Sequence, residues 1–485
     1  MKQKSLKINA ILNFIRSFIG LIFPLITFPY SSRVLLPEGI GRVNFAQSIV
    51  SYFIIIAGIG IYSYGIREAA KVREDKVGLS HFVKEIFIIN IISTAVAYIL
   101  FAVALLVVPR FKEYRVILCI CSATIIFTTI GLEWLYIAIE DYVYISIRSI
   151  AIQIISVILL FTFVKTQDDY LKYAAIAVVS GVGSNLMNFI HSRKIVNFKT
   201  GMRLELKRHL KPIFILFATC VAVQIYSALD TTMLGFLCNE WYVGIYSAAT
   251  KVNKVVLSGL LAVFATMMPR LSYYAGKNDK TEYINLVYKS LDFILLISIP
   301  CTIGLNLLSR DVVLLLSGQE FIDAITPMKI MNPIIIIIGL NNFFSSQVFL
   351  PLNKERYTLF AVMAGTICNF ALNFILIPLN QANGAAIATL AAESIVCLIN
   401  FILGRNTINF LFVLKRIVIY GLNCVVMAIP VLCCVYFIHV RWISLLCSII
   451  AGVITYFTIL YIEHNKLLLS IVNSIKLKLK NKCIK

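Results

Sequence analysis

Runs of apolar residues, separated by short polar stretches, repeat along the whole chain. A helix needs about 20 mostly apolar residues to cross the hydrocarbon core of a membrane, and by this measure the 485-residue sequence contains fourteen such runs. The predicted helices cover residues 8–31, 44–65, 84–108, 116–138, 144–164, 171–191, 212–237, 247–268, 286–308, 327–350, 357–379, 382–403, 415–438 and 441–462. This pattern predicts an all-α polytopic membrane protein with about fourteen transmembrane helices.

The longest polar connection is a basic stretch at residues 192–211, which follows the sixth run. It acts as a cytoplasmic linker between an N-terminal six-helix bundle at 1–191 and a second six-helix bundle at 212–403. Two additional transmembrane helices at 404–463 and a basic cytoplasmic tail at 464–485 complete the predicted organisation. No connection is long enough to form a soluble catalytic domain.

Two pairs of short segments indicate that the two bundles are an internal repeat. GIGRVNFAQS, which contains Gly41 and Ala46, matches WYVGIYSAAT, which contains Gly244 and Ala249, at an offset of 203 residues. A second pair, IAIEDYVY and PLNKERYT, lies between the fourth and fifth helices of each bundle. Many secondary transporters alternate access by rocking two related bundles about a midplane site. The repeat therefore favours a transporter.

Composition and charge support the same class. With 60% hydrophobic residues, 14% charged residues and a mean hydropathy of +0.89, the chain lies far outside the range of soluble proteins. The formal net charge of +21 would suit a nucleic-acid binder only if basic residues clustered on a soluble domain, so no nucleic-acid partner is expected. With the N-terminus inside, thirty lysines and arginines fall on the cytoplasmic side and ten on the other. Because positive loops stay in the cytoplasm, both termini are predicted to be cytoplasmic.

One face of the first run carries Arg16, a charged side chain that is unfavourable in contact with lipid. An arginine at the centre of a spanning helix costs about 2.5 to 3.5 kcal/mol on insertion scales. This face is therefore expected to line a polar cavity or to meet a partner, and Arg33 and Arg42 follow in the connection to the second run. The residues of this face recur at three- and four-residue spacing and are Asn13, Arg16, Ser17, Gly20, Pro24, Thr27 and Ser31.

The first two helices of the second bundle repeat this arrangement. Asp230 lies in the seventh run, and Lys251 and Lys254 lie in the eighth. One interpretation is a cavity with cationic walls that suits an anionic solute such as a phosphate. The other is that Asp230 pairs with a lysine and only ties helices together, while lysines near span ends extend to the interface. Arg148, near the start of the fifth run, is predicted to be interfacial.

Three single acidic residues, Glu133, Asp292 and Glu393, also fall within or beside predicted spans. A carboxylate at low dielectric can titrate near neutrality, so each is a candidate for coupling transport to a proton or sodium gradient. The alternative is that each bonds to a neighbouring helix. Kinks are expected at the intramembrane prolines Pro24, Pro300, Pro333 and Pro378 and at Gly58, Gly60 and Gly339.

The chain carries no pattern typical of catalysis, metal binding or ATP use. Its five histidines are isolated, and most of its twelve cysteines lie in apolar runs without Cys-x-x-Cys spacing. No glycine-rich phosphate loop is present. We therefore expect no enzyme, no metal and no cofactor.

Three stretches resemble a known family. SRVLLPEGIGRVNFAQSIVSYFIIIAGIGIYSYGIREAAKVRED, GLEWLYIAIEDYVYISIRS and SALDTTMLGFLCNEWYVGIYSAATKV are similar to the Wzx-type polysaccharide flippases of the multidrug/oligosaccharidyl-lipid/polysaccharide exporter superfamily. The resemblance extends over nearly the whole chain and includes the division into six, six and two helices. It implies a bacterial inner-membrane protein that moves undecaprenyl-pyrophosphate-linked oligosaccharide units to the periplasmic leaflet for O-antigen or capsule synthesis. Membrane lipids, a polysaccharide polymerase and a chain-length regulator are the candidate partners.

The resemblance also implies which residues contact the substrate. Arg16, Arg33, Arg42, Asp230 and Lys251 fall in or beside the matching stretches, and Lys254 joins them as the second cation of the eighth run. Three rivals remain open. A multidrug exporter of cationic compounds would line its chamber with carboxylates instead. A flippase for lipid-linked peptidoglycan precursor differs only in cargo. A membrane polymerase or ligase would need a large extracytoplasmic loop.

Overall fold

The computed structural model describes residues 6–198, 201, 203–265, 267–277, 279–405, 407–465 and 467–469. Within these ranges, the side chains of 6–18, 21, 219, 222 and 262–265 are not described. Every regular element in the described part of the chain is helical, which confirms the predicted all-α class. The basic tail lies outside the described residues beyond residue 469.

The chain forms two compact units, which divide between Ser247 and Ala248 inside helix α10. We call them unit 1 and unit 2. Unit 1 contains α1 Leu6–Gly58, α2 Ile61–Lys71, α3 Lys76–Val107, η1 Pro109–Lys112, α4 Arg115–Ile130, α5 Glu133–Ala138, α6 Tyr142–Phe163, η2 Gln167–Asp169, α7 Tyr170–Val182, α8 Ser184–Ile195, α9 Lys207–Leu237 and the first part of α10 Glu240–Ala265. Unit 2 contains the rest of α10, α11 Met268–Gly276, α12 Lys280–Leu316, η3 Gln319–Ala324, α13 Ile325–Met331, α14 Ile334–Asn342, the π-helical η4 Phe343–Phe349, α15 Glu355–Gly404, α16 Phe410–Phe437 and α17 Arg441–Ile462.

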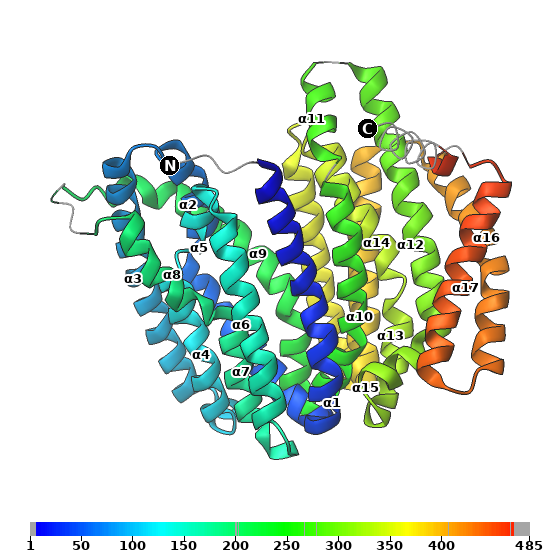
Figure 1. The fold of residues 1–485 in the computed structure, drawn as a ribbon, viewed down its shortest axis with the longest axis horizontal. Coiled ribbons are helices and arrows are strands. Elements are labelled where there is room, and N and C mark those ends of the chain that lie inside the picture. Colours follow the sequence, from blue (N-terminus) through cyan, green and yellow to red (C-terminus); the bar gives the residue numbers. More distant parts are fainter. Residues whose placement is uncertain are drawn as a thin grey trace, which may run out of the picture. The chain divides into compact units, whose positions relative to one another are not determined.

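Within each unit the long helices run side by side. In unit 1, α4 packs against α3 and α7, and α7 packs against α6 (Figure 1). In unit 2, α12, α16 and α17 pack against one another around a large apolar core (Figure 1). A smaller apolar core joins α2, α3 and α5 in unit 1.

Nine helices of the described chain are long and apolar enough to cross a membrane, or up to eleven if each of two bent pairs is one span. Two of the nine, at 22–71 and 355–404, are 50 residues long, and each covers two of the predicted runs. With these helices divided and with α10 included, the described helices account for every predicted run. The helix bend of 46° in the tenth run lies between α13 and α14, beside Pro333, where the sequence predicted a kink.

The first two runs meet at a short break, as the sequence predicted, but the helices extend farther into the connection at residues 31–44 than the predicted runs do. The backbone is helical from Leu6 to Gly58 except at Leu36, whose φ is 56°. Pro37 follows directly, and a residue that precedes proline is disfavoured in the α region. The break in α15 is equally local and falls at Gln381, whose φ is 46°.

Exposure along the helices is inverted relative to a soluble protein. On α15, Phe370 and Phe374 are 53% and 63% exposed, whereas Asn369 and Asn373 are buried. Such a surface suits lipid on the outside and polar contacts within.

Arg148 is also buried, which corrects the prediction that its side chain lies at the membrane interface. It is not interfacial but only 4% exposed, and its Nη1 donates to the Ser184 carbonyl oxygen at 2.7 Å.

Candidate substrate site at the contact of α1, α9 and α10

Two glycines allow α1 to touch the start of α10 inside unit 1. A Cβ added at Gly41 would overlap the carbonyl of Glu240, and a Cβ added at Gly244 would overlap the carbonyl of Pro37. Gly244 lies 203 residues after Gly41, and Glu240 lies 203 residues after Pro37. The contact is therefore reciprocal under the offset found in the sequence. A reciprocal contact of this kind is what a two-fold relation between repeats produces.

Next to this crossing, α1 and α9 share a set of hydroxyl groups. The Thr232 hydroxyl on α9 lies 3.1 Å from the hydroxyls of both Ser48 and Tyr52 on α1. One turn farther along, Gly235 meets the ring of Phe45 so closely that a Cβ would overlap it. The glycine thus brings the two backbones near enough for the short side chains to bond. Two residues before Thr232, Asp230 accepts through Oδ2 from the Tyr246 hydroxyl at 2.6 Å.

The predicted cationic residues of unit 1 occupy different surroundings. Arg16 lies on the α1 backbone, and its side chain is outside the described part. Arg33 is exposed and donates from Nη1 to the Pro29 carbonyl at 2.6 Å. Arg42 is half-buried, with its guanidinium 5.2 Å from the centre of the Tyr170 ring. The structure does not gather Arg33 with the hydroxyl groups of α1 and α9.

Lys251 and Lys254 lie on the part of α10 that belongs to unit 2. They are three residues apart and so share one helix face. Lys251 is half-buried and Lys254 is exposed. Both side chains have electrostatic or hydrogen-bond partners. A half-buried lysine on a long apolar helix is a candidate contact for an anionic group, and the substrate role of both lysines stays a prediction.

The acidic candidates for ion coupling are held by neighbouring helices. Asp292 on α12 accepts from the Tyr420 hydroxyl at 2.7 Å and pairs with Arg416 Nε at 3.0 Å, both on α16, and Asn465 donates to Tyr420. We call these four residues the Asp292 network. Glu393 on α15 accepts from Asn341 on α14 at 2.7 Å. For Asp292 and Glu393, these bonds favour the interpretation that the carboxylate bonds to a neighbouring helix over the interpretation that it couples transport to an ion.

Glu133, at the start of α5, follows Leu132, whose φ is 44°. It is half-buried and also has an interaction partner. Ion coupling through Glu133, Asp292 or Glu393 stays a prediction.

The sequence reading missed the most completely bonded carboxylate among the described residues, Glu85 on α3. Its side chain is 0% exposed and accepts from Arg208 at 2.6 Å and from the Glu205 backbone N–H at 2.5 Å. His209 Nε2 lies 2.9 Å and His81 Nε2 3.2 Å from the carboxylate. The Tyr64 hydroxyl contacts the other nitrogen of His209 at 2.7 Å. We call Glu85, His81, Arg208, His209 and Tyr64 the Glu85 network.

A signal for this network was present in the sequence. His81 and Glu85 are four residues apart at the start of a helix, and Arg208 and His209 are adjacent in the basic linker. Their meeting depends on a contact across more than 120 residues, which spacing alone does not reveal. The network anchors the end of the linker and the first turn of α9 to α3.

Comparison with known proteins shows which sequences this chain resembles. A family model described as polysaccharide biosynthesis protein matches residues 6–275. A relative from Escherichia coli (strain K12), named "Putative O-antigen transporter", is 26% identical over 392 residues, which cover 79% of this chain and 93% of the relative.

Solved structures share the fold. A lipid II flippase named MurJ, in an inward closed conformation, superposes with a TM-score of 0.73 at 17% identity and covers 95% of this chain and 99% of its own. An inward-facing multidrug resistance transporter of the MATE family gives a TM-score of 0.64 at 14% identity, covering 82% and 97%. At these identities the likeness concerns the fold alone, and it agrees with a polytopic all-α membrane protein.

Proposed function

Because the chain belongs to the polysaccharide biosynthesis protein family and is a Wzx-type flippase, we propose that it moves undecaprenyl-pyrophosphate-linked oligosaccharide repeat units. The direction is from the cytoplasmic to the periplasmic leaflet of a bacterial inner membrane. The product serves O-antigen or capsule synthesis. Transport proceeds by alternating access, and both termini lie in the cytoplasm.

The observation that carries this proposal is the reciprocal contact of Gly41 and Gly244. A rocking transporter needs a place where its two related halves touch closely at one side of the membrane and can separate. Because glycine has no side chain, Gly41 and Gly244 let the two helix backbones approach closely. Few side chains interlock at this contact, so the helices can also separate. Residues of both predicted repeats meet there, and the hydroxyl groups of α1 and α9 lie beside it.

The cargo sets three requirements. Its pyrophosphate is anionic, its glycan needs a polar path, and its polyprenyl tail can stay in lipid. In the proposal, Arg16, Lys251 and Lys254 attract the pyrophosphate. Ser48, Tyr52 and Thr232 offer hydroxyl groups to the glycan. The predominance of cations over carboxylates among these residues favours this cargo over the cationic compounds of a multidrug exporter.

The first test removes the proposed phosphate contacts. Arg16→Ala and Lys251→Ala should abolish surface polysaccharide while the protein reaches the membrane in normal amount. Loss of one charge-assisted contact weakens binding by about 1.5 to 3 kcal/mol. Arg16→Lys keeps the charge but loses the bidentate fork and should retain partial activity. Lys280→Ala, an exposed cation at the start of α12, is the matched control and should behave as wild type.

The alternative, in which Lys251 and Asp230 only hold helices together, makes the opposite prediction. If Lys251 served only to pair with Asp230, the double variant Lys251→Ala with Asp230→Ala would restore surface polysaccharide, because no orphaned charge would remain. We expect no restoration. Full recovery in the double variant, or a fall in protein amount in the single variants, would assign these residues to folding instead of transport.

The second test separates the cargo from peptidoglycan precursor. A deletion strain should accumulate lipid-linked oligosaccharide on the cytoplasmic leaflet and should keep a normal cell wall. Arrested cell-wall synthesis in that strain would favour the lipid II cargo instead.

Reporter fusions after Lys76 and Lys207 should give cytoplasmic signals, and a fusion near Asn239 should give a periplasmic one. A periplasmic signal at Lys207 would contradict the proposed orientation.

A further inference from the structure

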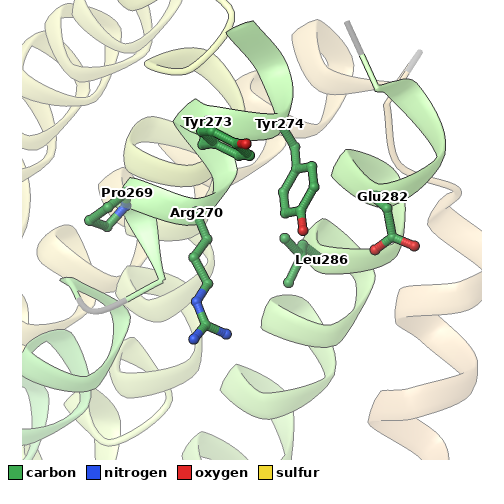
Figure 2. A pocket seen from close by; sticks show the side chains of 6 residues that line it. All are labelled: Pro269, Arg270, Tyr273, Tyr274, Glu282 and Leu286. Carbon is green, nitrogen blue, oxygen red and sulfur yellow. The ribbon is translucent and has the colours of Figure 1, made fainter. Parts of the chain in front are cut away.

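A pocket of about 440 Å³ opens between α11 and the start of α12 in unit 2 (Figure 2). Its lining consists of Pro269, Arg270, Tyr273, Tyr274, Glu282 and Leu286. This volume lies in the range of small-molecule sites. None of these residues belongs to the proposed substrate site, and none was singled out in the sequence as a binding residue.

The walls of the pocket are anchored to the core of unit 2. Leu271, between the lining residues of α11, is 0% exposed and packs in the apolar core. Tyr283 of α12 donates through its hydroxyl to the backbone of η4 at 3.3 Å. The turn between the two helices is closed by the Asp279 N–H, which donates to the Tyr274 carbonyl at 3.2 Å. The pocket is thus formed in advance by two fixed helices.

The pocket combines charges of both signs with aromatic groups. Figure 2 shows Arg270 and Glu282 on opposite sides of Tyr274, whose hydroxyl points toward Leu286. Arg270 and Glu282 are exposed, and neither forms an ion pair with another described residue. Tyr273 stands edge-on to Tyr274, with ring centres 5.4 Å apart. A purely anionic or purely cationic ligand would leave one of the two charges opposed by a like charge.

The pocket also lies at the first turns of α12, a helix that is long and apolar enough to cross a membrane. The apolar run of α12 begins at Leu286, on the pocket wall, and α11 is a short helix that precedes it. Ile284, which lies between Glu282 and Leu286 in the chain, is 40% exposed. Tyrosines at such a boundary have one apolar and one wet side. A lipid headgroup is therefore the ligand that we consider.

We propose that this pocket binds the headgroup of a zwitterionic phospholipid that carries a primary ammonium, such as phosphatidylethanolamine. Arg270 takes the phosphate through its fork of N–H donors. Glu282 accepts from the ammonium, and the Tyr274 ring offers it a π face. The Tyr273 ring already has Lys277 over it, with Nζ 4.6 Å from the ring centre. Leu286 and Pro269 contact the glycerol end. The lipid fixes α11 against α12 from outside and is distinct from the transported cargo.

The test uses the purified full-length protein in detergent. It is mixed with a fixed concentration of phosphatidylethanolamine, phosphatidylcholine or phosphatidylglycerol, and retained lipid is counted by native mass spectrometry. Wild type should retain phosphatidylethanolamine best. Phosphatidylcholine has no N–H to donate to Glu282, and phosphatidylglycerol brings no ammonium.

Two single variants and two matched controls locate the binding. Arg270→Gln and Glu282→Gln should each weaken retention of phosphatidylethanolamine about tenfold or more. Lys280→Gln removes a nearby exposed cation and Glu355→Gln removes an exposed carboxylate at the start of α15. Both controls should retain the lipid as wild type does. All four side chains are exposed, so none of these changes should prevent folding.

A charge exchange provides the independent check. Arg270→Glu combined with Glu282→Arg keeps one charge of each sign, so the headgroup can bind in the reverse direction and retention should recover in part. The proposal is wrong if both single variants retain phosphatidylethanolamine as wild type does. It is equally wrong if phosphatidylglycerol is retained as well as phosphatidylethanolamine. Neither result would affect the proposed cargo, because transport by the Arg270→Gln variant is measured separately through surface polysaccharide.

Discussion

Glu85 in unit 1 and Asp292 in unit 2 are both buried carboxylates that bond to a helix from a later part of the chain, but their surroundings differ. Each lies in the first half of the third helix of a predicted six-helix group, α3 or α12. Each carboxylate pairs with an arginine and with a ring-bearing residue on the helix that follows the group: Arg208 and His209 for Glu85, Arg416 and Tyr420 for Asp292. In both units a buried carboxylate therefore ties the next helix to the third one.

The surroundings of the two carboxylates differ. The segment that Glu85 holds is largely exposed from Arg203 to Lys211, and His209 is its most buried residue. The helix that Asp292 holds is α16, which also packs Tyr420, Cys424 and Met427 into the apolar core of unit 2. Apolar packing therefore helps to hold α16 in unit 2. In unit 1 the start of α9 also contributes Ile213 to an apolar core, but that core is smaller. Changes in the Glu85 network should cost more.

The largest effect is expected from Glu85→Ala. Removing one partner from a buried charged network typically costs about 3 to 5 kcal/mol, because the remaining polar groups lose their acceptor. We expect a fall toward the low end of that range, since Arg208 is half-exposed and can still reach water. The measurement is the free energy of unfolding of the purified protein in detergent. A loss equal to or smaller than that of Asp292→Ala would contradict the comparison.

The next effect is that of Asp292→Ala in unit 2. Arg416 is 29% exposed on its side chain and also stacks 5.3 Å from the centre of the Phe412 ring, so it keeps favourable contacts after the carboxylate is gone. We expect a loss of about 1 to 3 kcal/mol, the range for an unsatisfied buried hydrogen-bond partner. The same unfolding measurement applies. If Asp292 instead coupled transport to an ion gradient, surface polysaccharide would vanish without any loss of stability.

Two hydroxyl deletions sharpen the comparison further. Tyr64→Phe removes one bond to His209, and Tyr420→Phe removes a bond to Asp292 and another from Asn465. A neutral hydrogen bond contributes about 0.5 to 1.5 kcal/mol, so each variant should lose roughly that amount, with Tyr420→Phe the more affected. Both rings stay in place, which limits packing changes. Equal losses within error would mean that the bond from Asn465 contributes nothing.

The smallest effect is expected at Glu205, the second carboxylate beside Arg208. Its Oε2 lies 3.4 Å from Arg208, but its side chain is 64% exposed. Exposed ion pairs contribute about 0 to 1 kcal/mol, so Glu205→Gln should change the unfolding free energy only within that range. This variant is the matched control for Glu85→Ala, because it alters the same arginine. A loss comparable to that of Glu85→Ala would show that charge near Arg208, not burial, sets the stability.

Much of the architecture was predictable because hydropathy is a local property of the chain. Each predicted run corresponds to helix in the structure, and the bend beside Pro333 follows from the missing backbone donor of proline. The repeat offset was equally visible, since Gly41 and Gly244 sit in similar segments. The length of the connection between the first two runs was not predictable, because the single residue Leu36 is enough to break α1.

The intramembrane charges could be found from the sequence but their partners could not. A charge in an apolar run stands out because lipid excludes it, so Asp292, Glu393 and Lys251 were candidates at once. Arg148 and Glu85 were misjudged or missed because they lie near span ends, where a charge usually faces water. Only the approach of α8 to Arg148, and of the α9 start to Glu85, removed that water.

The sequence by itself determined the class of the protein, its helical content and the family it resembles, because all of these depend on composition and periodicity along the chain. The tertiary structure decided which residues meet. The reciprocal fit of Gly41 with Glu240 and of Gly244 with Pro37 depends on close packing between helices about 200 residues apart. So do the Glu85 and Asp292 networks, because a hydrogen bond needs two groups within about 3 Å, and only the folded chain sets that distance.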